Sequence, residues 1–550
     1  LRAAALAATC ALMAGRAEAL SIEPPPPTPV RAATDTYFGT EVKDPYRWLE
    51  NVKDPEVEAW MRAQADYARA VLDAIPGRDA LRKRIEQLDT ATPARVIDVQ
   101  RRPGGRTFFQ RRGAKDNQFK LYVRDGRGTR LLVDPEVIGK KTGTPHAINY
   151  MVPSWSGRYV AYGMSAAGSE DAELFVVDTR SGRTVLGPIT RAQFGSVGWL
   201  PDDTGLFVDR LQEMKPGMRP IEKYQKTRAI FIRLADGDRA AERAVTALSF
   251  ESPGVRIDAA QDSPMVVAVH GTPLALGRIF HGTDRELTAY VAPLADAAAG
   301  RAQWRKIVDR KDDVTALEIV GDRLYALTHR GASRFKLVET SVDKPDLANA
   351  RTLMTGEPGV LTALARTGDA LYVSRRDGAV SRLFRLPLTS DKGAVVVGKP
   401  LEVKLPIAGS FDISGTDPRL PGALLSLNGW TRGTQIYLAN AQGVSNTELQ
   451  PRGRYDALPD YVATEVLVPS HDGAKVPLSI IHRKGLKLDG SAPALLWGYA
   501  SYGFTEEPWF SAWRIAWLEQ GGVFAVANPR GSGAFGQDWY KGGFQATKPN

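Results

Sequence analysis

The sequence predicts a seven-bladed β-propeller that is followed by the strands and helix of an α/β domain. Three observations favour this fold class. Short alternating strands with Gly, Asp, Asn and Pro turns run from about residue 95 to about residue 449. A turn followed by a strand recurs seven times in this region, and continuous apolar runs come after it. A chain of 550 residues, 43% of them hydrophobic, is long enough for several domains with large cores.

Residues 1–19 have the pattern of a cleavable secretory signal peptide. Arg2 precedes the apolar stretch Ala3–Ala14, and Ala17-Glu18-Ala19 fits an A-x-A cleavage site. The stretch is too short to cross a bilayer as a helix. We therefore expect a secreted or periplasmic protein without stable membrane insertion. The alternative is a lipoprotein anchor at Cys10, which is the single cysteine of the chain.

Residues 20–92 are predicted to form a proline-rich tether and then a helical segment. The run that begins with Pro24–Pro27 cannot form a regular ladder and is expected to be a stiff polyproline stretch. Between Asp54 and Leu88 the apolar residues recur at helix-like spacing. Pro76-Gly77 interrupts this pattern, so the segment should contain two helices.

Residues 93–452 are predicted to form the propeller. The turn-and-strand units begin at Gly105, Gly157, Gly205, Ser263, Gly321, Gly368 and Gly422. Their spacing is close to the roughly 40–50 residues of a four-stranded blade, so seven units predict seven blades. Trp155 and Trp199 precede two of the turns, and we interpret them, with Asp178, as residues of outer strands and hairpins. A two-sheet sandwich array is the alternative, and the regular spacing favours the propeller.

Residues 453–550 change to the pattern of an α/β domain. Tyr461–Val468 and Val476–Ile481 flank Ser470–Gly473, which ends in Asp472-Gly473. An Asp-Gly pair between two such runs is a strong hairpin signal. The domain is therefore expected to begin with an antiparallel hairpin.

Two continuous apolar runs follow this hairpin. Pro493–Trp497 and Val523–Ala527 are typical of strands that are buried on both faces of a sheet. Between them, Trp513–Leu518 predicts a crossover helix that ends at Gly521-Gly522. This order is that of the front part of a doubly wound α/β domain.

Several ordered motifs resemble the prolyl oligopeptidase family of serine peptidases. They are Asp44–Glu50 (DPYRWLE), Gly498–Phe504 (GYASYGF), Ala527–Gly533 (ANPRGSG), Trp539–Gly543 (WYKGG) and Lys548–Asn550 (KPN). The resemblance covers residues 34–550. It implies an α/β-hydrolase domain built from an N-terminal and a C-terminal segment, with the seven-bladed propeller inserted between them as a size-selective lid. It also implies endopeptidase cleavage of short peptides after proline, through an acyl-enzyme and without a metal or organic cofactor.

The groups that attack and transfer protons in this chemistry are not found in the sequence. In the family the serine lies in a Gly-Gly-Ser-Asn-Gly-Gly elbow, followed by Asp and then His. No such elbow is present, and Ser532 and Ser501 fail the G-x-S-x-G pattern because Arg530 and Tyr499 stand where glycine is needed. We therefore expect the Ser/Asp/His triad to lie beyond Asn550. The catalytic domain is then truncated, and the chain as given should be inactive.

The histidines give no substitute for this triad. His471 and His482 lie in the predicted hairpin and are interpreted as surface or edge-strand residues. The others, which fall in the propeller without metal-ligand spacing, are His146, His270, His281 and His329. We therefore expect no metal site.

One tyrosine is predicted to take part in catalysis. The resemblance implies that a tyrosine hydroxyl on the loop after Leu495-Leu-Trp-Gly498 donates to the oxyanion, and by motif this residue is Tyr499. A phenol is uncharged at neutral pH and so keeps its donor. Tyr502 is the alternative because the loop is longer than the family's short Tyr-Gly-Gly-Phe form. Phe504 is expected to line the substrate-binding site as an apolar wall.

Composition and family alternatives limit the choice of partners. The net charge is +10 and the pI is about 9.4, yet there is no basic run and no RNA-binding aromatic signature. We expect short peptides as partners, no nucleic acid, and a monomer when complete. Two alternatives remain open, which are an oligopeptidase that cleaves after basic residues and a catalytically inactive scaffold that binds peptides.

Overall fold

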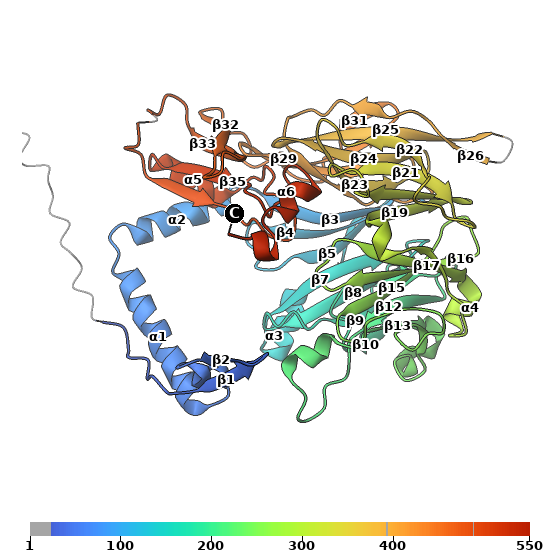
Figure 1. The fold of residues 1–550 in the computed structure, drawn as a ribbon, viewed down its shortest axis with the longest axis horizontal. Helices are drawn as coiled ribbons and strands as arrows, with labels where there is room; N and C mark the ends of the chain where they lie inside the picture. The colour runs from blue at the N-terminus through green and yellow to red at the C-terminus, as the bar shows by residue number, and fades with distance from the viewer. Residues whose placement is uncertain (1–23, 392–393, 488, 550) are drawn as a thin grey trace, which may run out of the picture. The chain divides into compact units, whose positions relative to one another are not determined.

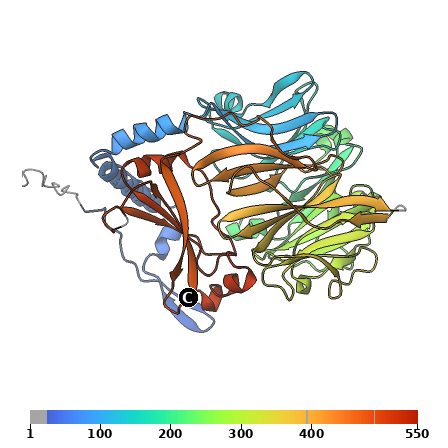
Figure 2. The same ribbon diagram turned by 90° about the horizontal axis from the view of Figure 1, so that it is seen from above.

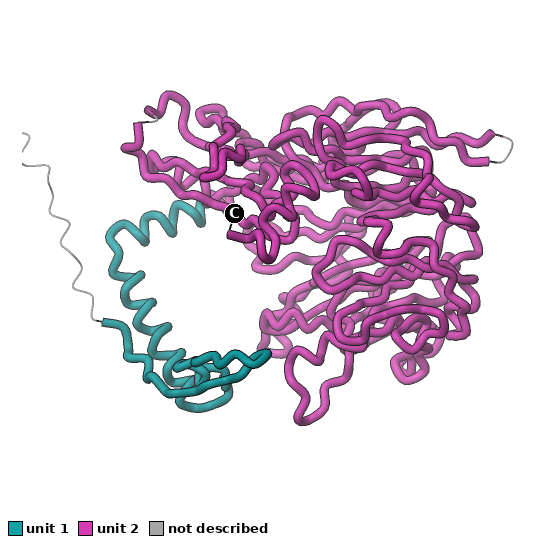
Figure 3. The backbone as a smooth tube through the Cα atoms, viewed as in Figure 1, with its two compact units in different colours: residues 1–87 teal, residues 88–550 magenta. Residues whose placement is uncertain are grey.

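The computed structural model describes residues 24–391, 394–487 and 489–549, and Figures 1 and 2 show its ribbon in two views. The predicted signal peptide, residues 1–19, therefore lies outside the described residues. The chain divides into two compact units at residues 87 and 88 (Figure 3). None of the helices within the described ranges is long and apolar enough to cross a membrane.

The first unit contains a small hairpin and the predicted helices. Its elements are β1 (Thr34–Tyr37), β2 (Thr40–Lys43), η1 (Arg47–Glu50), α1 (Pro55–Asp73) and α2 (Arg78–Asp89), the last of which extends into the second unit. Asp54 caps α1, because its carboxylate accepts the Glu56 backbone N–H at 2.9 Å. The break between the helices falls at Pro76-Gly77, as predicted.

The proline-rich tether has no regular secondary structure from Pro24 to Pro29, as expected, but it is not free of the helix. Gln64 Nε2 of α1 donates to Pro26 O at 2.7 Å, and Trp60 Nε1 donates to Thr28 Oγ1 at 3.1 Å. Trp48 Nε1 donates to Pro29 O at 2.9 Å. These three side chains thus anchor the tether, whose backbone forms no strand pairing of its own.

The second unit contains the propeller, and the described residues form its seven sheets. The first four blades are β3 (Ala94–Arg102), β4 (Arg106–Gly113), β5 (Lys120–Asp125) and β6 (Gly128–Val133); β7 (His146–Pro153), β8 (Tyr159–Ala166), β9 (Glu173–Asp178) and β10 (Thr184–Ile189); β11 (Gly198–Trp199), β12 (Gly205–Arg210), β13 (Arg228–Arg233) and β14 (Val245–Leu248); and β15 (Asp262–Ala268), β16 (Leu274–His281), β17 (Leu287–Pro293) and β18 (Arg305–Val308).

The last three blades follow in the same antiparallel order. They are β19 (Val314–Val320), β20 (Arg323–Thr328), β21 (Lys336–Ser341) and β22 (Arg351–Thr355); β23 (Val360–Arg366), β24 (Ala370–Asp377), β25 (Val380–Asp391), β26 (Ala394–Val397) and β27 (Leu401–Val403); and β28 (Ser410–Ser414), β29 (Ala423–Gly429), β30 (Arg432–Asn440) and β31 (Gly443–Asn446). Short helices in the connections are α3 (Pro135–Thr142), η2 (Pro220–Tyr224), η3 (Leu234–Arg239), α4 (Leu294–Ala298) and η4 (Arg310–Asp312).

The first strand of each blade lies nearest the propeller axis. First strands of neighbouring blades contact one another, for example β3 with β7 and β19 with β23. The ring closes where β28 of the last blade meets β3 of the first. Each blade is built from one continuous segment, so no strand is shared between the two ends of the propeller. At this closure the buried Gln450 accepts the Val96 N–H and donates to Ala94 O, both at 2.8 Å.

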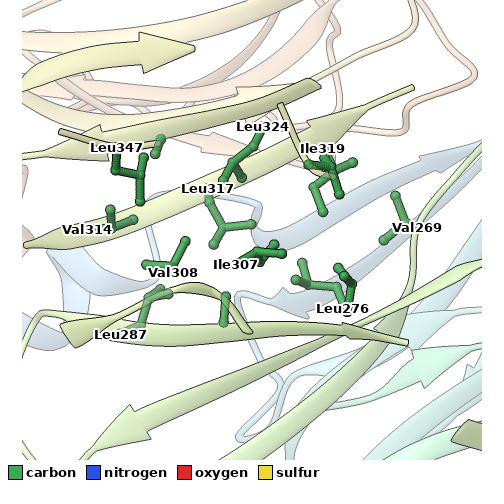
Figure 4. Packing of buried hydrophobic residues seen from close by; sticks show 14 of the residues in the cluster. Val269, Leu276, Leu287, Ile307, Val308, Val314, Leu317, Ile319, Leu324 and Leu347 are labelled. Atoms are coloured by element: carbon green, nitrogen blue, oxygen red, sulfur yellow. The ribbon is translucent and has the colours of Figure 1, made fainter. Parts of the chain in front are cut away.

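The cores lie between neighbouring blades, where the apolar faces of their sheets pack. Figure 4 shows one such core between the fourth and fifth blades, with Leu276 and Leu287 from one sheet against Leu317 and Leu324 from the next. All four side chains are buried. Burial of such side chains contributes roughly 1.5–3 kcal/mol each, so interfaces between blades are the main source of propeller stability.

Six of the seven predicted turn-and-strand units coincide with the second strand of a blade. The unit that begins at Ser263 is different, because it is β15, the first strand of the fourth blade, while the second strand is β16. Both strands of this hairpin alternate and follow turns, so the sequence pattern does not distinguish them. Asp178 lies in a hairpin as predicted, since its carboxylate accepts the Arg180 and Ser181 N–H groups at 2.8 and 3.0 Å.

The interpretation of two tryptophans as outer-strand residues is wrong. Trp199 lies in β11 and Trp155 lies two residues after the end of β7, so both are placed by first strands near the axis. Trp199 Nε1 donates to Val152 O, and Trp155 Nε1 donates to Trp199 O, both at 2.9 Å. Backbone acceptors that satisfy both indoles allow them to be placed inside the ring.

The C-terminal segment forms a four-stranded sheet in the order β32-β33-β35-β34, beside the propeller in Figure 2. Its elements are β32 (Tyr461–Pro469), β33 (Lys475–Arg483), β34 (Ala494–Trp497), α5 (Ala512–Glu519), β35 (Val523–Ala527), α6 (Gln537–Lys541) and η5 (Gln545–Thr547). The hairpin and the crossover helix agree with the prediction. β33 and β35 are antiparallel, whereas β34 and β35 are parallel.

The apolar run of β34 was expected to be buried on both faces, but among the described residues it forms the edge of the sheet. β34 pairs only with β35 among the described strands, and Leu496 and Trp497 are exposed. A continuous apolar run does not reveal whether its strand is central or at an edge. β35 is largely buried, as predicted.

Candidate active site

The candidate site lies where the two parallel strands end. β34 and β35 are parallel and adjacent, so their carboxyl ends, Trp497 and Ala527, lie at the same edge of the sheet. Residues that follow them contact each other, since Glu506 N–H donates to Asn528 Oδ1 at 2.8 Å and Asn528 Nδ2 donates to Glu506 O at 3.0 Å. Crevices outside the carboxyl ends of parallel strands are the usual ligand sites of open α/β sheets.

The three predicted site residues come together in one aromatic cluster. The ring centroids of Tyr499 and Tyr502 are 6.4 Å apart, and those of Tyr499 and Phe504 are 5.7 Å apart in an edge-to-face arrangement. Tyr499 and Tyr502 are each 52% exposed and Phe504 is 56% exposed. Both hydroxyls are therefore accessible to a ligand, and neither is a core tyrosine.

The loop that carries this cluster has a strained backbone. Ala500 and Tyr502 have φ angles of 55° and 56°, which lie in the left-handed region that non-glycine residues rarely adopt. The surroundings fix this conformation, because Gly503 N–H donates to Gly531 O at 3.0 Å and Lys548 Nζ donates to Ser501 Oγ at 3.1 Å. Strained residues that are held this firmly cluster at functional sites.

Gly531 permits this close packing of the two loops. Its φ is 94°, and a Cβ atom at this residue would lie 2.3 Å from Ala500 O. No other amino acid fits there without movement of the backbone. The Pro529-Arg-Gly-Ser segment therefore packs directly against the backbone of the tyrosine loop.

A cavity of about 610 Å³ lies between this loop and the propeller. Its charged and aromatic lining includes Arg285, Arg376, Asp412, Phe504, Glu506 and Glu507. Phe504 thus forms part of a cavity wall. The cavity is large enough for a short peptide segment, in the usual range of small-ligand pockets.

An ion pair joins the propeller to the loop at this cavity. The buried Arg376 of β24 contacts Glu507 at 2.9 Å and donates to Gly533 O at 2.5 Å, and Ser381 Oγ donates to Glu507 Oε2 at 3.0 Å. Burial, and then the charge of Glu507, raise the pKa of Asp412. The ion pair between Arg376 and Glu507 thus connects the propeller to the C-terminal segment beside the cavity.

A second contact attaches the helix of the sheet to the propeller. The buried Arg514 of α5 lies over the rings of Trp509, Phe524 and Trp430, with its Cζ 4.1, 4.6 and 5.0 Å from their centroids. Burial lowers the pKa of Arg514 to about 10. Aromatic faces on several sides replace part of the lost hydration of this guanidinium.

The histidines near the sheet do not build a catalytic triad. Ser470 Oγ lies 3.4 Å from His471 Nδ1, but Asp472, the neighbouring carboxylate, pairs with Arg530. His482 Nδ1 contacts Arg483 O at 2.8 Å. Within the described ranges, no serine is joined to a histidine that is in turn joined to a carboxylate.

One hydroxyl–imidazole–carboxylate chain does occur in the propeller. His281 Nδ1 lies 2.9 Å from Asp262 Oδ1, and His281 Nε2 lies 2.8 Å from Thr288 Oγ1. Thr288 is only 6% exposed, so a substrate does not reach its hydroxyl. The chain joins the ends of β15, β16 and β17 and stabilises the fourth blade. No cluster of metal-binding side chains is present among the residues that the structure describes.

Two models of one protein family match this chain. The family model described as "Prolyl oligopeptidase, N-terminal beta-propeller domain" matches residues 25–447, and that described as "Prolyl oligopeptidase family" matches residues 508–550. The chain belongs to the prolyl oligopeptidase family. This family consists of serine peptidases, and its propeller and hydrolase fold are those described above.

Relatives within the prolyl oligopeptidase family match most of the chain. The prolyl endopeptidase of Elizabethkingia meningoseptica is 26% identical over 96% of this chain and 71% of its own length. Prolyl oligopeptidase A of Galerina marginata is 24% identical over 92% of this chain and 70% of its own length.

Solved structures of the family have the same fold. A prolyl endopeptidase from a study of inter-domain dynamics superposes with a TM-score of 0.83 at 28% identity, over 95% of this chain and 74% of that one. Prolyl oligopeptidase B of Galerina marginata, bound to a 25-residue macrocyclization substrate, gives a TM-score of 0.79 at 21% identity, over 96% of this chain and 74% of that one.

The sequence patterns anticipated the local aromatic cluster but not the long-range contacts beside it. Tyr499, Tyr502 and Phe504 lie close in sequence and are brought together. Arg376 and Glu507 were not anticipated, because 131 residues separate them and no local pattern marks such a pair. Asn528 follows directly on a predicted strand, and this position at a carboxyl end was the available signal.

Proposed function

We propose that the protein is an endopeptidase that hydrolyses short peptides after proline, with the scissile bond between the tyrosine loop and the propeller. The observation that carries the proposal is the half-exposed cluster of Tyr499, Tyr502 and Phe504 beside a cavity shared by sheet and propeller. Membership of the prolyl oligopeptidase family supports the reaction type. The relatives named prolyl endopeptidase support the preference for proline.

In this proposal Tyr499 stabilises the transition state. Attack on the scissile carbonyl turns its oxygen into an oxyanion, and a fixed O–H donor stabilises this charge more than it stabilises the ground state. Tyr499 follows the end of β34 by two residues, and its loop is fixed by the bonds to Gly531 and Lys548. Tyr502 is the alternative donor from the same cluster. Phe504 is the apolar surface against which a proline ring packs.

The propeller acts as a lid in this proposal, and a set of side chains at its far end supports this role. We call Trp155, His270, Arg366, Asp417 and Arg419 the axial hub; all five follow or end the first strand of a blade. Contacts with the C-terminal segment come instead from the opposite face, for example from Ser410 at the start of β28.

The axial hub joins blades that are not neighbours in the ring. The Trp155 and His270 rings stack at 5.4 Å, and the Arg419 guanidinium lies 4.9 Å from the Trp155 ring centroid. Arg419 pairs with Asp417 at 2.6 Å. Side chains that cross the axis in this way obstruct its far mouth, which favours entry of peptides from the side of the sheet.

A specific observation favours a second candidate, cleavage after basic residues. The cavity wall carries the carboxylates of Asp412, Glu506 and Glu507 but only two arginines, Arg285 and Arg376. A surplus of negative charge attracts a lysine or arginine side chain.

Two substrates distinguish these candidates. We expect the complete gene product to hydrolyse a Gly-Pro-anilide with kcat/KM about 100-fold higher than a Gly-Arg-anilide, because a site shaped for one side chain rejects a mismatched one. The measurement is the release of aniline product over a range of substrate concentrations. Preference for the arginine substrate would instead support the second candidate. Peptide binding without hydrolysis of either substrate would support an inactive scaffold.

We also propose that the protein is secreted or periplasmic and monomeric. The support for export is the signal-like pattern of residues 1–19. The protein would then encounter its short peptide substrates outside the cytoplasm.

A further inference from the structure

A second cavity, of about 210 Å³, lies beside the axial hub. It is bounded by the fourth blade (Val267–His270, Leu276 and Arg278), the fifth blade (Glu318 and Ile319), Arg366 at the end of β23 and Trp155 of the hub. This cavity is distinct from the candidate active site, because it lies at the opposite ends of the first strands. Its volume exceeds the roughly 30 Å³ share of one water several-fold.

Three charged side chains line this cavity without a side-chain ion pair between them. Burial raises the pKa of Glu318, and this effect is partly offset by the charges of Arg278 and Arg366 and by a hydrogen bond that Glu318 accepts from the Arg366 backbone N–H. Neither guanidinium lies within the 4.0 Å of an ion pair with this carboxylate. Arg366 Nη1 donates to Ile319 O at 2.5 Å, and Arg278 Nη2 donates to Leu317 O at 3.4 Å. The Nε atoms of both arginines are buried without a partner among the described groups.

All three side chains are partly buried, where charges without an ion pair are costly, so a ligand with complementary charges would lower this cost. A simple anion would be attracted by Arg278 and Arg366 but repelled by Glu318. A simple cation would be attracted by Glu318 but repelled by both arginines. A ligand that presents a negative and a positive group at short separation complements all three side chains.

The rest of the lining is suited to the apolar part of such a ligand. Val267, Leu276 and Ile319 supply aliphatic surface, and Trp155 supplies an aromatic edge. Burial lowers the pKa of His270, so this ring is neutral at physiological pH and adds no further positive charge. The cavity therefore combines an apolar wall with a positively charged side, formed by two arginines, and a carboxylate.

We propose that this cavity binds a free amino acid in its zwitterionic form. The carboxylate lies against Arg278 and Arg366, the ammonium group against Glu318, and the side chain against the aliphatic wall. The ligand contacts the fourth, fifth and sixth blades at once. Its binding therefore stabilises the propeller in addition to occupying the cavity.

Isothermal titration calorimetry with L-proline tests this proposal on the complete protein. We expect saturable binding of one L-proline per chain and a rise in the thermal midpoint. Acetate, which carries only the carboxylate, and methylammonium, which carries only the cation, should each bind at least about tenfold more weakly, because each leaves a charged group unpaired. The test needs no peptidase activity, so its result is independent of the proposed function.

Two variants and matched controls locate the site. Glu318→Gln and Arg366→Gln should each weaken L-proline binding by about 10- to 100-fold. Glu448→Gln and Arg233→Gln, which make the same changes at exposed residues, should leave it unchanged. Ala268→Val narrows the cavity without changing its charge and should also abolish binding, which guards against a folding defect in the charge variants.

The outcomes that overturn the proposal are equally specific. Saturable binding of acetate or inorganic phosphate as tight as that of L-proline would identify a plain anion site. L-proline binding that survives Glu318→Gln and Ala268→Val would place the ligand elsewhere. No saturable binding of L-proline or glycine to the wild-type protein would mean that water alone occupies the cavity.

Discussion

Replacing Tyr499 with phenylalanine is expected to lower kcat by about 10²–10³ while KM stays nearly unchanged. The change removes one hydroxyl and leaves the ring, so the contacts of Tyr499 with Tyr502 and Phe504 are kept. The lost hydrogen bond is made mainly to the oxyanion, and therefore kcat and kcat/KM should fall together. Steady-state hydrolysis of a Gly-Pro-anilide by the complete gene product is the measurement.

Tyr502→Phe is the matched control for this prediction. Tyr502 lies in the same cluster and is equally exposed, at 52%. If it donates no hydrogen bond to the oxyanion, its loss should change kcat by less than about threefold, as for an exposed hydroxyl without a partner. A large loss in Tyr502→Phe together with normal activity in Tyr499→Phe would move the assignment to Tyr502.

Asp209→Asn is expected to stabilise the propeller by up to about 4 kcal/mol at about pH 8, and by little at about pH 4. Asp209 of β12 is 1% exposed, and neither carboxylate oxygen makes a hydrogen bond of normal geometry to a described group, although the Ser196 hydroxyl and backbone N–H lie near enough to act on it. Burial raises the pKa of Asp209 to about 7, and Ser196 offsets only part of this effect.

The sign of this pH dependence follows from which state holds the proton. Between about pH 4 and about pH 7 the folded protein keeps Asp209 protonated while the unfolded chain has lost the proton, so stability falls as pH rises through this window. Asparagine is neutral at every pH and removes this slope. Urea unfolding of both proteins at several pH values measures the difference.

The control for Asp209 is the same change at Asp238, which is exposed. Asp238→Asn should alter the free energy of unfolding by less than about 0.5 kcal/mol at every pH. An Asp209→Asn variant that is less stable than the wild type at about pH 8, or equally shifted at all pH values, would contradict the account.

The sequence predicted the architecture because propeller blades are local in sequence. Each blade of four or five strands comes from one continuous segment, so a turn followed by a strand is enough to count blades. The same locality explains the error at Ser263, since β15 and β16 of one hairpin have equivalent patterns. The burial of β34 could not be predicted from its own residues, because burial of a strand depends on neighbouring strands from elsewhere in the chain.

Contacts across the ring, and contacts between the propeller and the sheet, could not be predicted from local sequence patterns. Trp155 contacts His270 from a non-neighbouring blade, and its position at the axis depends on closure of the whole ring. The cavity charges Arg278, Glu318 and Arg366 come from three different blades. By contrast, Tyr499 and Phe504 lie on one loop, so the motif alone identified both of them as candidate site residues.

The central claim is that peptides react between the propeller and the sheet and enter by separation of these two parts. Ser333 of the propeller and Asp538 of α6 offer a place to lock them, because Asp538 N–H donates to Ser333 Oγ at 2.9 Å. The variant Ser333→Cys/Asp538→Cys, with Cys10→Ser, would be oxidised to form a disulfide across this contact. The two single-cysteine variants, treated with the same oxidant, are the controls.

The decisive measurement is the turnover of a peptide of about ten residues before and after this oxidation, and again after reduction. The account predicts that the cross-linked protein loses its activity, that reduction restores it, and that both controls stay active throughout. Undiminished turnover in a fully cross-linked sample would contradict entry between propeller and sheet.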